Sequence, residues 1–584
     1  MRHSKLPANL ANGVFRRWMI TMFAVVVCQQ PALANPETWD ADDLIAGQKG
    51  VGYCVLQGTQ LDSFEVEILG VQHDVIQPGR DLILARLSGA NLEETGLFHG
   101  MSGSPVFVEG MLVGAVAHGW TFSMEPICGI TPIREMLDLL EQDLSGPNEY
   151  PMAATPPVGT LHRIEPLPLP VWVSGAGRGV EAFLADVLEP MGMIPVTGLG
   201  ASASTTNPPG DLKPGSSVGV QMVRGDMSVS AIGTVTWIEG DRVLAFGHPY
   251  LSVGAVDMPM TRTVVHGVLP SQYSSFVLGS TGETIGALRQ DRSVGVAGLL
   301  GEEAWMLPVA VTVDGPSGTR TLKTEVLDHS LLSSSLAQIV VFSALESAER
   351  LLGLASLDVQ LLVTLSDGRE VIWNQVFSGL HAPLFAARGV GGPIASLVWS
   401  GLQDVRLERV DVHIDVRDDV RVARIASVRH EPQQPRAGRP LTLQIELAPV
   451  QAPRQQMDID VILPASARGL PVQIQLGSGS AALSWVAQRQ DELPPRTSDE
   501  LLRRLERPRR EDELVIEIVA DAPGLSVGGQ SMPSLPASVG RWLQQTPSVG
   551  HVGRVSGRVL HTQRMRVPYV LENEQVIDLG SLDQ

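Results

Sequence analysis

A serine set between glycines is the feature of this sequence best suited to chemistry. It lies in the stretch Gly100-Met101-Ser102-Gly103-Ser104-Pro105, which follows one strand-like run and opens another. The glycines and the proline let the backbone turn sharply and expose a hydroxyl. A serine becomes a nucleophile when a base takes its proton and backbone N–H groups stabilise the oxyanion. The stretch predicts a nucleophile loop; the simpler interpretation is a glycine-rich turn with a capped serine.

Ser102 is the preferred nucleophile in this stretch, which we call the serine loop. Gly-x-Ser-Gly-x-Pro is the pattern of chymotrypsin-like nucleophile loops, so Ser104 is the weaker candidate. Gly100 lets the backbone approach a substrate closely. The N–H groups of Gly100 and Ser102 can converge on one point in such a loop, and we expect them to form the oxyanion hole.

His248 is the preferred base. It follows a strand-like run and stands between Gly247 and Pro249. The alternative interpretation is a turn histidine that hydrogen-bonds to the backbone. Three further histidines compete for the role of base, namely His99, His118 and His266. No His-Glu-x-x-His or Cys-x-x-Cys spacing is present, so the sequence predicts no metal site, and the chemistry requires no cofactor.

Two strand-rich units must position these residues. Residues 35–145 form the β unit that carries the serine loop, and its run 64–69 alternates between apolar and acidic side chains, as a half-buried strand does. Residues 211–330 form the β unit that carries His248. Two β units of similar size suggest the two barrels of a chymotrypsin-like peptidase, with the site in the cleft between them.

The remaining segments complete a mainly β chain. Residues 146–210 predict a linker with a short helix over Val180–Leu188, because they are rich in proline, glycine, serine and threonine. Residues 331–400 predict a helix followed by a β-hairpin. Residues 401–584 predict a β-sandwich-like region, to which the alternating run 410–416 is assigned. A basic helix capped by Thr497 or Ser498 is expected within this region.

Composition narrows the function classes. A chain of 584 residues is too long to fold around one ordinary hydrophobic core, so we expect several domains. Its 59 glycines and 41 prolines suit many short strands and turns. The formal net charge of −20 argues against nucleic-acid binding, which needs a positive field. Only 5% of the residues are aromatic, so a carbohydrate-binding or adhesive β-protein has no specific support.

The first 34 residues resemble a targeting segment. Arg16-Arg17 precedes an apolar run over 18–27, and Ala32-Leu33-Ala34 is a small-x-small cleavage site, so we expect a signal peptide cleaved after Ala34. No later stretch reaches eighteen unbroken apolar residues, so we expect an exported protein without a stable membrane span, in the periplasm or outside the cell. Export would leave Cys54 and Cys128, which either form a disulfide or are two small buried residues.

Residues 45–140 and 211–320 resemble the SpoIVB-type serine peptidases (the stage IV sporulation protein B family). The resemblance rests on four stretches, of which the serine loop is the most specific: Glu94-Thr95-Gly96, the serine loop, Val113-Gly114-Ala115-Val116-Ala117-His118 and Leu244-Ala245-Phe246-Gly247-His248. It implies an endopeptidase with its serine at Ser102 and its histidine at His248.

The chain departs from this family in three ways. In the family the histidine segment precedes the serine segment, whereas here the order is reversed, as if the barrels were permuted. The family's PDZ domain is not evident ahead of the catalytic region. The family acid shortly before the serine loop is missing, and Asp291, 43 residues after His248, is the preferred substitute. The other substitutes are Asp81 and Asp257.

Two functions of different classes follow from these patterns. The first is an exported serine endopeptidase that hydrolyses protein or peptide substrates through Ser102 and His248. The second is a catalytically silent envelope protein that uses a peptidase fold as a binding scaffold, which the missing acid favours. The sequence names neither a substrate nor an oligomeric state.

Overall fold

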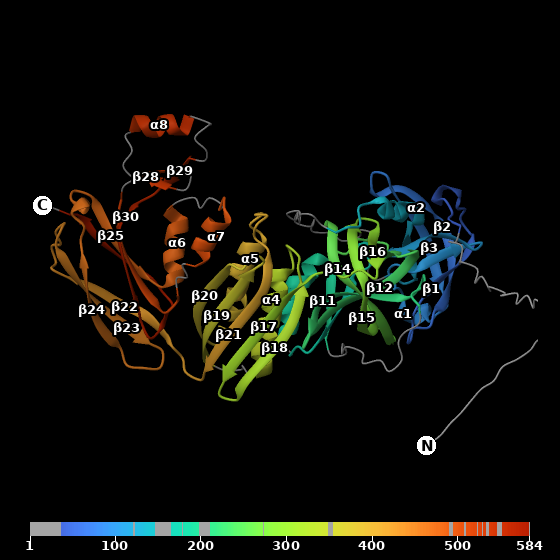
Figure 1. Ribbon diagram of the computed structural model, residues 1–584, viewed down its shortest axis with the longest axis horizontal. Helices are drawn as coiled ribbons and strands as arrows, with labels where there is room; N and C mark the ends of the chain where they lie inside the picture. The colour runs from blue at the N-terminus through green and yellow to red at the C-terminus, as the bar shows by residue number, and fades with distance from the viewer. Residues whose placement is uncertain are drawn as a thin grey trace, which may run out of the picture.

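The computed structural model describes most of the chain beyond residue 36. The described residues are 37–120, 123–146, 165–177, 179–197, 211–272, 274–348, 354–489, 495–506, 510–521, 524–527, 530–532, 537–545 and 552–582. The expected signal peptide lies outside them. Figure 1 shows a row of β units, from the first barrel at the N-terminal end to a sandwich at the C-terminal end. No helix in the described residues has the length and apolar character needed to cross a membrane.

The first barrel carries the serine loop. Its sheet closes because β5 pairs with both β1 and β6. In order around the barrel, the strands are β1 (Lys49–Cys54), β2 (Asp62–Gln77), β3 (Arg80–Ser88), β7 (Ile127–Pro132), β6 (Met111–Gly119) and β5 (Pro105–Val108). Short elements lie around it: η1 (Ala41–Asp43), α1 (Leu92–Thr95), β4 (Phe98–His99), α2 (Ile133–Leu137) and η2 (Asp138–Glu141). The alternation along β2 buries Phe64, Val66 and Ile68 in the core, as predicted.

The second barrel carries His248 and closes in the same way, since β11 pairs with both β12 and β14. In order around the barrel, the strands are β11 (Ser217–Gly225), β12 (Ser228–Glu239), β13 (Arg242–Ala245), β16 (Gly295–Leu300), β15 (Ser275–Arg292) and β14 (Gly254–Leu269). The prediction of a chymotrypsin-like double barrel is therefore confirmed, with the serine on the barrel that comes first in the chain.

The two barrels share apolar cores. Val265 and Val277 of the second barrel belong to the core of the first. A separate cluster joins Ala115 and Met136 of the first barrel to Leu244 of the second. In addition, β4 pairs in parallel with β15. This extensive contact holds the two barrels in one relative position, as a site built from both of them requires.

The segment expected as a linker is more ordered than predicted where it is described. It contains β8 (Glu165–Pro166), β9 (Leu169–Ser174), α3 (Val180–Leu188), η3 (Glu189–Met191) and β10 (Met193–Thr197). The helix has the predicted bounds. β9 pairs with β12 of the second barrel and with β10, so these residues extend that sheet. Proline and glycine content indicated turns but carried no information about these long-range pairings.

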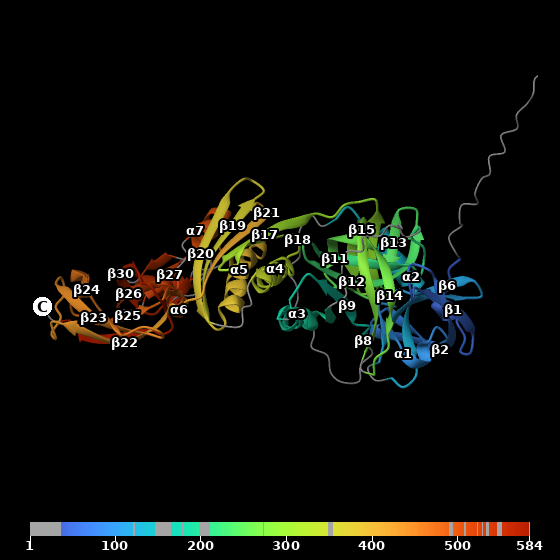
Figure 2. The ribbon, with the colours of Figure 1, turned by 90° about the horizontal axis from the view of Figure 1, so that it is seen from below.

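A middle sheet and two helices follow. The strands are β17 (Met306–Gly315), β18 (Gly318–Leu327), β19 (Ala355–Leu365), β20 (Glu370–Gly379) and β21 (Leu407–Arg417). Figure 2 shows α4 (Ser333–Ala348) and α5 (Ala382–Val398) side by side against these strands. The predicted helix and hairpin are both present. The run 410–416 was wrongly assigned to the sandwich: β21 lies between β17 and β19, because alternation predicts a strand but not its partners.

The C-terminal region is a β-sandwich with smaller additions. One sheet contains β24 (Gln455–Ile462), β23 (Pro440–Pro449), β22 (Val422–Glu431) and β31 (Val570–Leu571). The other contains β30 (Arg558–Arg566), β26 (Glu513–Ala520), β25 (Pro471–Gly477) and β32 (Gln575–Ser581). Their inner faces share one core. The additions are η4 (Ala465–Ala467), α6 (Gly479–Arg489), α7 (Ser498–Leu505), β27 (Gly524–Val527), β28 (Gln530–Met532), α8 (Ala537–Gln545) and β29 (Val552–Val555). Thr497 caps α7, as predicted.

Candidate active site

The serine loop connects β4 to β5 and depends on two glycines with positive φ. Gly100 has φ +104° and Gly103 has φ +94°, values that favour glycine. A Cβ on Gly103 would collide with the Thr234 carbonyl oxygen and lie 2.6 Å from the Phe246 nitrogen. The loop backbone therefore lies directly against the second barrel, close to the segment that leads to His248.

Hydrogen bonds from β12 of the second barrel hold the serine loop. The Thr234 hydroxyl donates to the Gly100 carbonyl (3.0 Å), and the Thr236 hydroxyl donates to the Gly103 carbonyl (2.8 Å). The Thr234 N–H donates to the Ser102 carbonyl (2.8 Å). Sequence reasoning missed both threonines. The only available signal was their alternation with apolar residues on a strand whose two faces are both buried.

The two hydroxyl groups of the serine loop differ in their hydrogen bonding. The hydroxyl of Ser102 is shielded from solvent and has no hydrogen-bond partner among the described residues. The Ser104 hydroxyl, by contrast, donates to the Met101 carbonyl at 2.6 Å and so closes the turn. The Gly103 N–H donates to Val116. The N–H groups of Gly100 and Ser102, expected to form the oxyanion hole, donate none of the backbone hydrogen bonds found in the described turns and loops.

His248 lies on a strained turn after β13. Phe246 has φ +69°, which is uncommon for a residue with a side chain, and Gly247 has φ +68°. The Gly247 carbonyl accepts a hydrogen bond from the Thr131 hydroxyl of the first barrel at 2.6 Å. A Cβ on Gly247 would lie 3.0 Å from the Cβ of Ala115 on β6. The first barrel therefore holds the histidine turn, just as the second barrel holds the serine loop.

The hydrogen bonding of His248 determines its tautomer. Its Nδ1 donates to the Pro249 carbonyl at 2.8 Å, so in the neutral ring Nε2 is the acceptor. Nε2 is buried and makes no hydrogen bond with any described group, Ser102 included. Burial lowers the pKa of His248 to about 4, with a smaller contribution from His99. The ring is thus neutral at pH 7 and can accept a proton at Nε2.

Two of the competing histidines lie in the same region. The ring of His118, on β6, is buried, and its pKa is lowered to about 3 by burial and by the nearby His248. Burial likewise lowers the pKa of His99, three residues before Ser102, to about 4. The Nδ1 atoms of both rings are buried without a partner in the described structure. His266 lies apart, on β14, with its Nε2 2.7 Å from the hydroxyl of Ser280.

Asp291 supports the segment after His248 rather than the imidazole. Its carboxylate accepts from the N–H groups of Tyr250 (2.7 Å) and Leu251 (2.6 Å). It is fully buried, which raises its pKa to about 6. The Nδ1 of His248, which an aspartate of a catalytic triad would bind, faces the Pro249 carbonyl instead. A direct bond from Asp291 to the candidate base is therefore absent from the described contacts.

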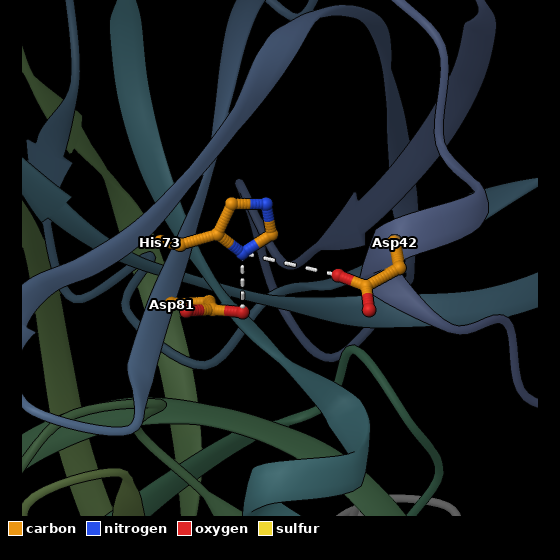
Figure 3. Close-up of side chains that lie close together, drawn as sticks. All are labelled: Asp42, His73 and Asp81. Atoms are coloured by element: carbon orange, nitrogen blue, oxygen red, sulfur yellow. Dashed lines mark hydrogen bonds and ion pairs between the residues drawn. The ribbon is translucent and has the colours of Figure 1, made fainter.

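The two other acids weighed for this role are engaged elsewhere. Asp257 forms an ion pair with the buried Arg289. Asp81 accepts from Nδ1 of His73 at 2.9 Å, and Asp42 lies 3.8 Å from the same nitrogen (Figure 3). The hydrogen bond with Asp81 is the main cause of a raised pKa at His73. Potential ligand atoms of Asp42, His73 and Asp81 lie within 4.8 Å of one another, but the cluster is largely exposed, and Nδ1 of His73 already donates to Asp81.

The two cysteines are free thiols in the structure, so of the two alternatives left open by the sequence the structure shows two buried residues and not a disulfide. Cys54 lies on β1 and Cys128 on β7, which are three strands apart in both directions around the first barrel. A disulfide needs Cα atoms within about 7 Å of each other. Both side chains pack in the barrel core, and burial raises the pKa of Cys54 to about 12.

A cavity of about 520 Å³ lies between the barrels but is separate from the serine. Arg80 and Glu135 of the first barrel line it together with Ser252 and Asp291 of the second. Neither Ser102 nor His248 is among its lining residues. The cavity therefore borders the segment that follows His248.

The fold and the arrangement of the candidate site together indicate the structural class of the protein. Two six-stranded barrels with a serine loop on one and a histidine turn on the other, at their interface, form the architecture of a chymotrypsin-like serine peptidase. The family model of SpoIVB peptidase S55 matches residues 29–137, which include the serine loop and all six strands of the first barrel. This match supports a peptidase of the SpoIVB type. No curated protein and no solved structure matches the chain.

Proposed function

We propose that this protein is an exported serine endopeptidase in which Ser102 is the nucleophile and His248 the general base. The observation that supports the proposal is that two buried polar atoms at the barrel interface, the Ser102 hydroxyl on a loop held by the second barrel and Nε2 of the neutral His248, have no hydrogen-bond partner among the described residues. Unpaired buried polar atoms cost free energy, so their gathering at this interface calls for an explanation. A peptide substrate would supply the missing partners.

The proposed reaction begins with proton transfer from the Ser102 hydroxyl to Nε2 of His248. The Ser102 oxygen forms a bond to the substrate carbonyl carbon, and the carbonyl oxygen becomes an oxyanion that accepts from the N–H groups of Gly100 and Ser102. The carbon–nitrogen bond then breaks, and the imidazolium protonates the leaving amine. Water hydrolyses the acyl-enzyme by the same sequence, with His248 again as the base.

The Pro249 carbonyl takes over part of the role of the missing carboxylate. It holds Nδ1–H and so directs the basic nitrogen away from Pro249, but a neutral carbonyl stabilises the developing imidazolium less than a carboxylate does. We therefore expect a slower enzyme than one with a complete triad. Asp291 is a positioning residue in this proposal, because it acts on His248 through the N–H groups of Tyr250 and Leu251.

A serine-reactive fluorophosphonate probe tests the assignment. The native protein should be labelled and should hydrolyse casein, and Ser102→Ala should abolish both. Ser104→Ala is the matched control. It removes the hydrogen bond to the Met101 carbonyl that closes the turn, but it should retain labelling. His248→Ala should reduce labelling by about 10³-fold or more, whereas Asp291→Asn should reduce it less. Labelling that survives Ser102→Ala would overturn the assignment.

The second candidate, a catalytically silent binding scaffold, rests on two observations. The Ser102 hydroxyl is shielded from solvent, and the Pro249 carbonyl occupies the position of a triad acid. Absence of both labelling and casein hydrolysis in correctly folded protein would favour it. Export is part of the main proposal, and the N-terminus of protein recovered outside the cytoplasmic membrane should then be Asn35.

A further inference from the structure

The chain places one of its own segments along the strand that follows the serine loop. β8 pairs in antiparallel fashion with the end of β6, with Pro166 opposite His118 and Glu165 opposite Gly119. The next residue, Leu167, donates its N–H to the Ala117 carbonyl at 2.9 Å. An extended stretch of chain therefore occupies the edge of β6 beside the histidines of the site.

This edge is coupled directly to the serine loop. The Val116 carbonyl accepts the Gly103 N–H at 2.7 Å, and the neighbouring carbonyl, that of Ala117, accepts the Leu167 N–H. The same short stretch of β6 thus holds the nucleophile loop and the resident segment. Peptides commonly bind proteins by adding a strand to an open edge, where main-chain hydrogen bonds give affinity and side-chain pockets give selectivity.

Leu167 fills a socket on the first barrel. Its side chain is 5% exposed and belongs to the core cluster of that barrel. A Cβ on Gly119 would lie 3.0 Å from the Leu167 Cδ2 and 3.1 Å from the Leu97 Cδ1. The absence of a side chain at Gly119 therefore makes the room that the leucine takes.

The segment is also stiff. Pro166 and Pro168 flank Leu167, and Pro170 follows two residues later. Proline fixes φ and keeps the preceding residue extended, so the segment loses little conformational entropy when it lies against β6. Burial lowers the pKa of His99, and a hydrogen bond with the Pro168 carbonyl opposes this effect, so this end of the segment lies beside His99.

We propose that residues 165–168 are a built-in inhibitor: they occupy the edge of β6 at Ala117–Gly119, to which an extended peptide substrate would add as a strand. The inference rests on the proposed function and adds a substrate class, namely extended peptides with an aliphatic side chain at the Leu167 position. In this proposal the substrate must displace residues 165–168 before it can pair with β6.

Peptide binding tests the inference without requiring catalysis. The probe is a fluorescent peptide Arg-Ile-Glu-Pro-Leu-Pro-Leu-Pro, which copies residues 163–170, and its control carries aspartate in place of the first leucine. The protein is the full chain with Ser102→Ala. Adding Leu167→Ala, which empties the socket, should tighten binding of the leucine peptide by about tenfold or more. The aspartate peptide should bind to neither protein.

Two further variants serve as controls for the peptide-binding experiment. Leu169→Ala makes the same chemical change two residues along, in the core shared with the second barrel and the middle sheet, and should not improve peptide binding. In Gly119→Ala the added methyl group takes part of the space that the Leu167 side chain occupies. The Leu167 N–H should therefore exchange its hydrogen faster, and the leucine of the added peptide should find no room. Equal peptide affinity in the Ser102→Ala protein with and without Leu167→Ala would overturn the inference, as would equal binding of both peptides.

The inference and the proposed function can fail separately. In one case the Ser102→Ala, Leu167→Ala protein binds the leucine peptide more tightly, but the Leu167→Ala protein that retains Ser102 shows neither labelling nor hydrolysis. Peptide docking at the edge of β6 then stands and the catalytic proposal fails. If native protein and Leu167→Ala, both with Ser102, are labelled and hydrolyse casein at the same rate, the catalytic proposal stands and the built-in inhibitor is disproved.

Discussion

The two barrels have the same number of strands but differ in what they bury. The first encloses an apolar core, and its buried polar side chains are few: Thr95, Ser102, Ser104, His118 and Thr131. The second buries many more, and these include hydroxyls on β11, β12, β14 and β15 and the guanidinium of Arg289, which pairs with the half-buried Asp257. Some of its hydroxyls bond only to each other, as Ser230 does with Thr281 at 3.2 Å.

The polar groups of the first barrel lie where it meets the second. The Thr131 hydroxyl donates to the Gly247 carbonyl, and the Thr95 carbonyl accepts from the Ser275 hydroxyl at 2.6 Å. The Ser102 backbone accepts from Thr234. An apolar barrel can fold around its own core, whereas these bonds form only when the barrels dock. Ser102, the proposed nucleophile, therefore belongs to one barrel, but its loop is held in position by the other.

The largest expected effect comes from forcing the barrels apart at Gly103. In Gly103→Ala the new methyl group meets the Thr234 carbonyl and the Phe246 nitrogen, which are backbone atoms and cannot rotate away. We expect a loss of about 3 kcal/mol or more in the free energy of unfolding and complete loss of probe labelling. Urea denaturation followed by tryptophan fluorescence measures the first quantity.

Gly110→Ala is the matched control for this change. Gly110 has φ +82°, so alanine there carries a similar backbone strain, but no atom lies within 4 Å of the added methyl group. It should cost about 1 kcal/mol, with labelling retained. Equal behaviour of the two variants would mean that strain within the first barrel, not docking of the second, controls the serine loop.

The buried imidazoles at the interface predict a specific acid sensitivity. The folded-state pKa of His118 is lowered to about 3, against an ordinary value of 6.5, so the unfolded chain takes up a proton first as the pH falls. This contribution to stability is fully present above pH 6.5 and is lost progressively as the pH falls toward 3. At pH 5 the loss is about 2 kcal/mol for such a histidine.

His118→Phe tests this sensitivity, because phenylalanine fills similar space without a titrating group. The free energy of unfolding of the variant should fall less between pH 7 and pH 5, by about 2 kcal/mol, than that of the native protein. His381→Phe, at an exposed position on the middle unit, is the control. An unchanged pH dependence in His118→Phe would show that this ring is not buried in the neutral form, and the interface would then be more open than the barrel comparison implies.

The sequence predicted what depends on local pattern and missed what depends on docking. Alternation and turn residues indicated both barrels, and the Gly-x-Ser-Gly-x-Pro pattern indicated the serine loop. The partner of β21 and the hydroxyl bonds from Thr234 and Thr236 were missed, because no local pattern encodes which distant strand lies alongside. Asp291 was singled out from its spacing to His248, yet its carboxylate faces Tyr250 and Leu251, which only the folded turn reveals.

The smallest predicted effect isolates one hydrogen bond between the barrels. Thr236→Val keeps the shape of the side chain but removes the hydroxyl that donates to the Gly103 carbonyl at 2.8 Å. We expect about 1 kcal/mol of destabilisation and a several-fold slower probe reaction, because the serine loop keeps its other two bonds to Thr234. Thr324→Val is the matched control: its buried hydroxyl also donates to a strand carbonyl, that of Val309 at 3.1 Å, but within the β17–β18 hairpin. It should cost a similar free energy of unfolding and leave the probe reaction unchanged. If both variants slow the reaction equally, general loosening would explain the effect, and the second barrel would not position the nucleophile through this bond.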